Sequence, residues 1–300
     1  MESWASGIEF ERPGPLKRLV KAVLIDPVGN YAPAAWLRGI LRLTKSELAA
    51  ANWEDPGGWR SMVMSYEGRA RQIADKILVG GGTMAMALRN RKRLAARVLA
   101  RLIDDLPHNP VHVLCLGAGP GYVITDAMVQ ARSASVATLV DLNSDAFEFG
   151  RWLARRRGVA DRVRFVEGDA RHVREMLEHP PHMVKMLGIC EYLTDGQIVD
   201  IARAVAEVMP PAAPMVFNSI SKAHHSDRFL RRVFGLHMNH RSPEQLQELM
   251  GGAGFGDFVS LPEPLGVYHI VVGRRLAGRP VRPGKDDHAR PVRALGARAT

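Results

Sequence analysis

The feature that most constrains the fold of this chain is a glycine-rich turn at residues 117–121, which follows a short apolar segment. Residues 111–116 are rich in β-forming side chains, and this pattern predicts a buried parallel strand. Pro120 fits the start of a helix, and residues 122–131 can form that helix. A strand, a turn and a helix in this order are typical of an α/β sheet that binds a nucleotide-like ligand at its strand ends. The glycines that let the backbone approach such a ligand closely are Gly117, Gly119 and Gly121.

Two further apolar runs end in acidic residues. Residues 136–140 lead into Asp141, and residues 163–166 lead into a segment that contains Asp169. A carboxylate at the tip of the second strand can accept hydrogen bonds from both hydroxyls of a ribose. An acidic residue at the tip of the third strand lies one strand further along, where an adenine amino group would reach it. The two positions therefore predict a nucleoside site.

The chain resembles the class I S-adenosylmethionine (SAM)-dependent methyltransferases in three motifs, LCLGAGPG, LVDLN and VEGDA, which fall in the order and spacing of that family. The resemblance covers roughly residues 95–275 and implies SAM as the cofactor. It also implies a seven-stranded, doubly wound, mostly parallel sheet that ends in an antiparallel pair. One departure is Cys115, where the family usually carries an acid near the methionine amino group. The cofactor-binding residues implied are Tyr66, Arg69, Gly117, Ala118, Gly119, Gly121, Asp141, Leu142, Asp169, Ala170, Gly188 and Glu191.

Composition changes along the chain predict three segments. Residues 1–107 are expected to form a helical cap or lid, with helices over 61–77 and 83–104, and residues 108–276 the SAM-binding Rossmann-like domain. Residues 277–300 form a basic, proline-containing tail whose composition predicts disorder. Four of the five tryptophans fall in the first 60 residues. They fit a substrate lid or ordinary cap packing, and this segment could also pair two chains as a homodimer.

Candidate catalytic residues follow the fourth and fifth predicted strands, which border the ligand site in a sheet of this kind. Tyr192, beside Glu191, comes after the fourth strand, and His224 and His225 lie in the loop after the fifth. Either histidine could take a proton from an acceptor during methyl transfer, although adjacent loop histidines are more often surface residues. No metal site is expected, because the histidines with ligand-like spacing have no carboxylate or cysteine nearby to complete a set.

The net charge of +10 raises the question of a nucleic-acid partner. The tail supplies a surplus of four positive charges, and the arginines spaced four apart from residue 89 to 101 fit a solvated helix face. The segment after the fourth strand reads GICEYL, without the Asn/Asp-Pro-Pro-aromatic motif of family members that methylate bases. The preferred prediction is therefore a small-molecule acceptor and no nucleic acid.

The leading hypothesis is a cytoplasmic methyltransferase of secondary metabolism that acts on a small molecule. Two cysteines without a disulfide framework fit a reducing compartment, and no signal peptide or membrane-spanning run is expected. One alternative is an enzyme that uses the aminocarboxypropyl arm of SAM, by transfer or by cyclisation, and releases methylthioadenosine. The other is an RNA methyltransferase or RNA-binding protein, for which binding would weaken steeply with salt.

Overall fold

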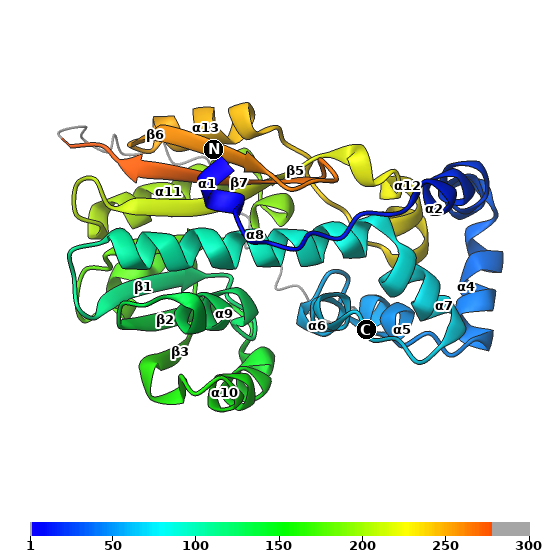
Figure 1. Cartoon of the computed structure of the whole chain (residues 1–300), viewed down its shortest axis with the longest axis horizontal. Helices are drawn as coiled ribbons and strands as arrows, with labels where there is room; N and C mark the ends of the chain where they lie inside the picture. The colour runs from blue at the N-terminus through cyan, green and yellow to red at the C-terminus, as the bar shows by residue number, and fades with distance from the viewer. Residues whose placement is uncertain (1, 278–300) are drawn as a thin grey trace.

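A computed structural model describes residues 2–277 and is built around one seven-stranded sheet (Figure 1). The strand order is β3-β2-β1-β4-β5-β7-β6, in which β7 runs antiparallel to both of its neighbours and the other pairings are parallel. This arrangement confirms the predicted doubly wound sheet with its antiparallel pair at one edge. The strands are β1 (Val111–Leu116), β2 (Ser135–Asp141), β3 (Val163–Glu167), β4 (Met183–Met186), β5 (Pro214–Ile220), β6 (Phe255–Pro262) and β7 (Tyr268–Arg275).

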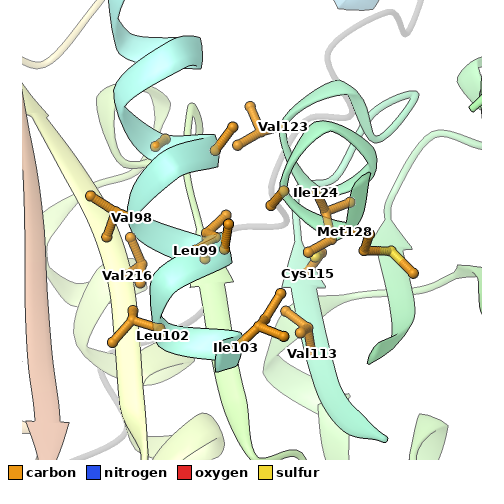
Figure 2. Close-up of a cluster of buried hydrophobic side chains, with 14 of the residues drawn as sticks. Val98, Leu99, Leu102, Ile103, Val113, Cys115, Val123, Ile124, Met128 and Val216 are labelled. Atoms are coloured by element: carbon orange, nitrogen blue, oxygen red, sulfur yellow. The ribbon is translucent and has the colours of Figure 1, made fainter. Parts of the chain in front are cut away.

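Helices cover both faces of the sheet. On one face, α8 (Thr83–Asp105) and α9 (Tyr122–Gln130) bury apolar side chains against the strands, as Figure 2 shows for Leu99 and Ile124. On the other face, α11 (Asp195–Val208) and α13 (Pro243–Gly252) do the same. Helix α8 therefore packs directly on the sheet, although it falls within the segment 1–107 that the sequence assigned to the cap.

The starts of α11 and α13 follow from the capping chemistry of their first residues. The Thr194 hydroxyl accepts a hydrogen bond from the backbone N–H of Gln197, and the Gln197 side chain accepts one from the backbone N–H of Thr194. Ser242 and Gln245 make the same reciprocal pair at α13. The remaining helical elements of the sheet domain are η3 (Ser144–Ala146), α10 (Phe147–Arg156), η4 (Ala160–Arg162), η5 (Ala170–Met176), η6 (Cys190–Tyr192), η7 (Lys222–His224), α12 (Asp227–Phe229) and η8 (Leu230–Phe234).

The N-terminal helices from α2 onward gather at one end of the sheet, to the right in Figure 1, and pack against η8. The indole nitrogen of Trp53 donates to the carbonyl of Val233 at 2.8 Å, and Arg38 donates to the same carbonyl at 3.2 Å. This part of the cap is thus fixed to the loop that follows the fifth strand. Its elements are α2 (Pro15–Val20), η1 (Lys21–Ile25), α3 (Asp26–Tyr31), α4 (Ala34–Leu43), α5 (Glu47–Glu54), α6 (Trp59–Glu67), α7 (Ile73–Asp75) and η2 (Lys76–Gly81). The first helix, α1 (Glu2–Ala5), lies apart from them beside α8 (Figure 1).

The predicted helix over residues 61–77 is interrupted at residues 68–72, because α6 ends at Glu67 and the chain is helical again only from Ile73, in α7 and η2. Gly68 takes a left-handed conformation (φ 67°) and ends α6, after which the chain turns before α7 begins. The break follows from Gly68 itself, because only glycine adopts this conformation without steric cost. It lets the chain leave α6 and approach the start of α8.

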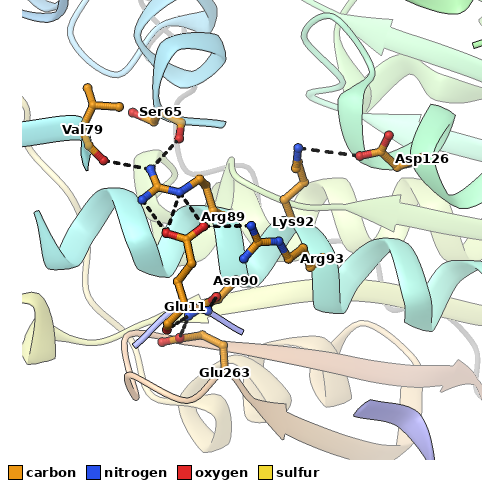
Figure 3. A network of polar contacts seen from close by, with 9 residues as sticks. All are labelled: Glu11, Ser65, Val79, Arg89, Asn90, Lys92, Arg93, Asp126 and Glu263. Carbon is orange, nitrogen blue, oxygen red and sulfur yellow. Dashed lines mark hydrogen bonds and ion pairs between the residues drawn. The ribbon is translucent and has the colours of Figure 1, made fainter. Parts of the chain in front are cut away.

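The prediction of a solvated arginine face on α8 is wrong at Arg89, whereas the side chain of Arg93 remains 39% exposed. Arg89 is only 6% exposed, and its guanidinium donates to Glu11 and to the carbonyls of Ser65 and Val79 (Figure 3). Arg93 also pairs with Glu11, at 2.8 Å. The extended segment before α2 runs along α8 and covers this face, a long-range contact that helical periodicity does not reveal.

Two further observations concern membrane-spanning helices and the predicted basic tail. Among the described residues, none of the helices is long and apolar enough to cross a membrane. The predicted basic tail, residues 277–300, lies outside the described residues apart from its first residue.

Candidate functional site

The larger of two neighbouring cavities has a volume of about 380 Å³ and lies over the carboxyl ends of the central strands. The glycine turn after β1 forms part of its floor, with Gly117, Ala118 and Gly119 in the lining. Helix α6 of the cap contributes Trp59 and Tyr66 to the opposite wall. The cavity is therefore built jointly by the sheet and the cap.

Different structural constraints act on the three glycines of the turn. All three have positive φ, of 55°, 50° and 80° in chain order. A Cβ on Gly117 would meet Ile189 at 2.0 Å, and one on Gly121 would meet Leu139 at 2.5 Å. Around Gly119, by contrast, the nearest atom to a Cβ would be 4.0 Å away. Gly119 thus leaves open cavity beside its backbone, whereas Gly121 does not line the cavity and serves the packing of the turn on β2.

Carboxylates occupy the β2–β3 half of the larger cavity. Asp141 Oδ2 accepts from the backbone of Gly119 at 2.7 Å, and Oδ1 accepts from Asn143 at 3.0 Å. Asp169 forms an ion pair with Arg171 at 2.5 Å, and the hydrogen bond from Arg171 lowers the pKa of the Asp169 carboxyl. Since a carboxylate oxygen can accept more than one hydrogen bond, both groups still offer acceptor sites to a ligand.

Cations occupy the β4 half of the same cavity. Arg91 on α8 and Lys185 on β4 both line it and are 3% and 4% exposed. Burial alone would lower the pKa of Arg91, but Tyr66, Tyr268 and Glu191 around it raise that pKa above its ordinary value, so the guanidinium stays charged. Burial lowers the pKa of Lys185.

These two cations were not predicted. Arg91 was hidden among the other arginines of α8, whereas a single lysine within the apolar strand Met183–Met186 was a usable signal.

The cap adds one more acidic residue that the sequence analysis missed. Asp55 lines the larger cavity, and its Oδ1 is buried without a hydrogen-bond partner. Burial raises the pKa of this carboxyl, and Glu54, Asp145 and Asp141 nearby raise it further, against Arg60. An unpartnered buried oxygen in a cavity wall is a ready acceptor for a ligand donor.

The predicted cofactor residues fall into two groups in the structure. One group lines the larger cavity, and the other does not. Arg69 is exposed and lies in neither cavity, and Gly121 packs behind the turn. Glu191 lines the smaller cavity instead. The predicted residues that line the larger cavity are Tyr66, Gly117, Ala118, Gly119, Asp141, Leu142, Asp169, Ala170 and Gly188.

The smaller cavity, of about 160 Å³, lies between the cap and the loops after β4 and β5. Its walls are mainly apolar side chains of the cap, α8 and η8. Tyr192, predicted as catalytic, lines both cavities, and the two also share Gly57, Met62 and Gly188. Burial raises the pKa of the Tyr192 phenol well above its ordinary value, so the hydroxyl stays protonated at neutral pH.

The two histidines predicted as catalytic line neither cavity. His224 is fully buried and contacts His240 through the two Nε2 atoms at 3.2 Å, and its Nδ1 lies 2.9 Å from Ser226 Oγ. His225 is exposed. No group of three or more His, Cys, Asp or Glu side chains that could hold a metal ion occurs in residues 2–277.

The polar and charged side chains of the larger cavity fit SAM. Hydroxyls and an adenine amino group need acceptors, which Asp141 and Asp169 supply at the β2–β3 half. A carboxylate needs cations, which Arg91 and Lys185 supply at the β4 half. The open space beside Gly119 permits close approach of a ligand to the turn. The acceptors at one end of the cavity thus match the nucleoside end of SAM, and the cations at the other end match its carboxylate.

Comparisons with known proteins agree with this geometry. A family model described as "Putative methyltransferase" matches residues 72–275. The curated proteins, in contrast, give no significant match.

Solved structures similar to the chain share its fold at low identity. A protein of Bordetella parapertussis described as a possible exported protein has a TM-score of 0.66 at 15% identity, over 89% of this chain and 100% of that one. The magnesium protoporphyrin IX methyltransferase of Synechocystis, solved with bound S-adenosylhomocysteine (SAH), has a TM-score of 0.54 at 12% identity, over 79% and 99%. An O-methyltransferase family protein of Burkholderia thailandensis has a TM-score of 0.51 at 14% identity, over 82% and 71%.

Proposed function

The chain belongs to this methyltransferase family, and on that premise we propose that it methylates a small molecule held in the smaller cavity. The protein is a SAM-dependent methyltransferase of the class I fold. This confirms the family, the enzyme class and the cofactor that the three sequence motifs implied. The acceptor and its setting are our proposal.

The larger cavity is the proposed cofactor site. Asp141 receives the ribose hydroxyls, and Asp169 and Asp55 offer acceptors to the base end. Arg91 and Lys185 receive the carboxylate of the amino-acid arm, a role for which the sequence had suggested the exposed Arg69. When bound there, SAM supplies an electrophilic methyl group on its sulfonium.

The observation that carries the proposed function is that the two cavities meet. Four residues line both cavities, so two ligands, one in each cavity, would meet beside them. These residues are Gly57, Met62, Gly188 and Tyr192. Alignment of two bound reactants is the main contribution a protein can make to such a transfer. Because the Tyr192 hydroxyl stays protonated, it orients an acceptor by donating a hydrogen bond and does not take its proton.

Three further parts of the proposal concern the setting of the enzyme. We keep secondary metabolism as the setting and the cytoplasm as the location, which the two free, buried cysteines support. Large apolar side chains are exposed along α2 and η1, which supports pairing of two copies through the N-terminal segment. They include Leu16, Leu19, Val23 and Leu24.

Mass spectrometry of nucleoside products tests the proposed function. The pure protein is incubated with SAM alone and with a panel of small phenols and amines. The proposal predicts SAH only when an acceptor is present. Methylthioadenosine formed from SAM alone, above a protein-free control, would instead mean that the aminocarboxypropyl arm reacts. RNA added at low salt should neither bind nor be methylated.

A further inference from the structure

Glu191 has one carboxylate oxygen that the protein leaves unpartnered. Its side chain is 3% exposed, and Oε1 lies 3.2 Å from the guanidinium of Arg91. Oε2 is buried and has no hydrogen-bond partner, and Glu191 lines the smaller cavity. A buried hydrogen-bond acceptor without a partner destabilises the folded protein, so its presence at this position requires an explanation.

The other charged side chains around the smaller cavity satisfy one another. Lys21 and Asp26, which also line it, form an ion pair in which Nζ lies 2.7 and 2.6 Å from the two carboxylate oxygens. Asn52 donates to the carbonyl of Leu48 and accepts from the backbone of Gly57. Among the described residues that line the smaller cavity, Glu191 is therefore the charged side chain with a free hydrogen-bond acceptor.

The rest of that wall fixes the class of molecule it accepts. Met62, Met84, Leu88 and Phe234 are among the apolar side chains that face the cavity. Its volume of about 160 Å³ is close to the roughly 150 Å³ of an apolar cavity that holds benzene. The walls thus select a body about the size of one aromatic ring, and Glu191 selects a hydrogen-bond donor on it.

We infer that the acceptor is a small, largely apolar molecule that presents an O–H or N–H to Glu191 Oε2, and that Glu191 takes this proton during methyl transfer. The inference rests on the proposed function and names its substrate class. It gives the proton-accepting role to Glu191, for which the sequence had suggested His224 or His225.

The step balances in atoms and electrons. A lone pair of the acceptor oxygen or nitrogen forms the new bond to the methyl carbon, and the electron pair of the broken carbon–sulfur bond stays on sulfur. The acceptor proton moves to Glu191 Oε2. One positive and one negative charge are neutralised together, while Arg91 continues to hold Oε1. No further reactant is needed.

The test uses ligand binding and not turnover. The protein is labelled with ¹³C at its methionine methyl groups and titrated with p-cresol or 4-methylanisole, which differ by the hydroxyl proton and one methyl group. The inference predicts that p-cresol shifts the signals of Met62 and Met84 and binds about tenfold more tightly or better, as expected for a hydrogen bond to a charged group. Met128, on the buried face of α9, should not respond.

Two variants assign the preference to Glu191. Glu191→Gln keeps the side-chain shape, and the double variant R91M/E191M replaces the whole buried pair by apolar groups of similar size. Both should lower the preference for p-cresol toward unity. Equal affinity of the two ligands for the wild-type protein, a preference retained in both variants, or no response at Met62 and Met84 would each overturn the inference.

The same samples separate this inference from the proposed function. Calorimetric titration with SAH reports on the larger cavity, and the p-cresol preference reports on the smaller one. A protein that binds SAH but shows no p-cresol preference contradicts the inference and leaves the function standing. A protein with the preference but no SAH binding contradicts the function.

Discussion

The guanidinium of Arg91 lies 3.2 Å from the carboxylate of Glu191, and both side chains are only 3% exposed. Arg91 lines the larger cavity, and Glu191 lines the smaller one. Arg91 also donates to the hydroxyl of Tyr66 at 2.8 Å and lies 4.6 Å from the ring centroid of Tyr268. This ion pair therefore forms the partition between the two cavities and ties α8 to the segment after β4.

Removal of Arg91 should destabilise the protein strongly. Arg91→Ala leaves the Glu191 carboxylate buried without its counter-charge, a change that costs about 3–5 kcal/mol in comparable buried pairs. Urea denaturation measures this free energy of unfolding. Arg132→Ala is the matched control, because its pair with Asp104 is exposed and should contribute at most about 1 kcal/mol. Similar costs for the two variants would contradict a buried, paired Arg91.

Asp141→Asn should weaken SAM binding. The variant replaces an oxygen that ribose hydroxyls need, and the loss should be roughly 1–3 kcal/mol of binding free energy. Isothermal titration calorimetry measures it directly. Asp145→Ala serves as the control, because Asp145 is exposed and does not line the cavity, and should leave the affinity unchanged. An unaltered affinity of the Asp141 variant would remove this residue from the ribose site.

His224 should make the folded protein less stable in acid. Burial, helped by the neighbouring His240, lowers the pKa of His224 from 6.5 to about 4, with Asp227 acting in the opposite sense and His225 and Lys21 in the same sense. Below pH 6.5 the unfolded chain binds a proton that the folded chain does not. Stability is therefore lost as the pH falls from about 6.5 toward 4, by roughly 2–3 kcal/mol.

Thermal unfolding between pH 7.5 and 4.5 measures this dependence. His224→Gln should flatten the profile relative to the wild type, because the other histidines are the same in both proteins. A variant profile parallel to that of the wild type would show that His224 is not the group responsible.

The exposed apolar side chains of α2 and η1 should bring two chains together. Leu19 and Val23 are 61% and 69% exposed, and such surface is costly in a monomer. Light scattering after size exclusion should give twice the mass of one chain for the wild type, and the mass of one chain for the double variant Leu19→Glu, Val23→Glu. A wild-type protein that stays monomeric at high micromolar concentration would exclude this pairing.

The sheet and the floor of the site could be predicted because their signals are local. The apolar run before Gly117 and the acid that ends the next strand, Asp141, carry their meaning in neighbouring residues. The structure places Gly117 and Asp141 in the wall of the larger cavity. The caps at Thr194 and Ser242 were readable for the same reason, since a capping box involves only residues three apart.

The rest of the site depends on contacts that are distant in sequence. In the sequence, Arg89 resembles a surface residue. In the fold, the segment that contains Glu11, 78 positions away, covers it. Arg91 and Glu191 are 100 positions apart, and neither has a local pattern that reports the other. The histidines after the fifth strand carried no such information, because loop conformation alone placed His224 against His240 and not in a cavity.

In the proposed enzyme the cofactor and the acceptor meet where the two cavities join. A crystal structure of the protein with SAH and p-cresol tests it most directly. We expect the ribose hydroxyls on Asp141, the sulfur near Gly188 and Tyr192, and the phenol oxygen on Glu191 Oε2. SAH bound with its ribose away from Asp141, or p-cresol bound outside the smaller cavity, would contradict the account.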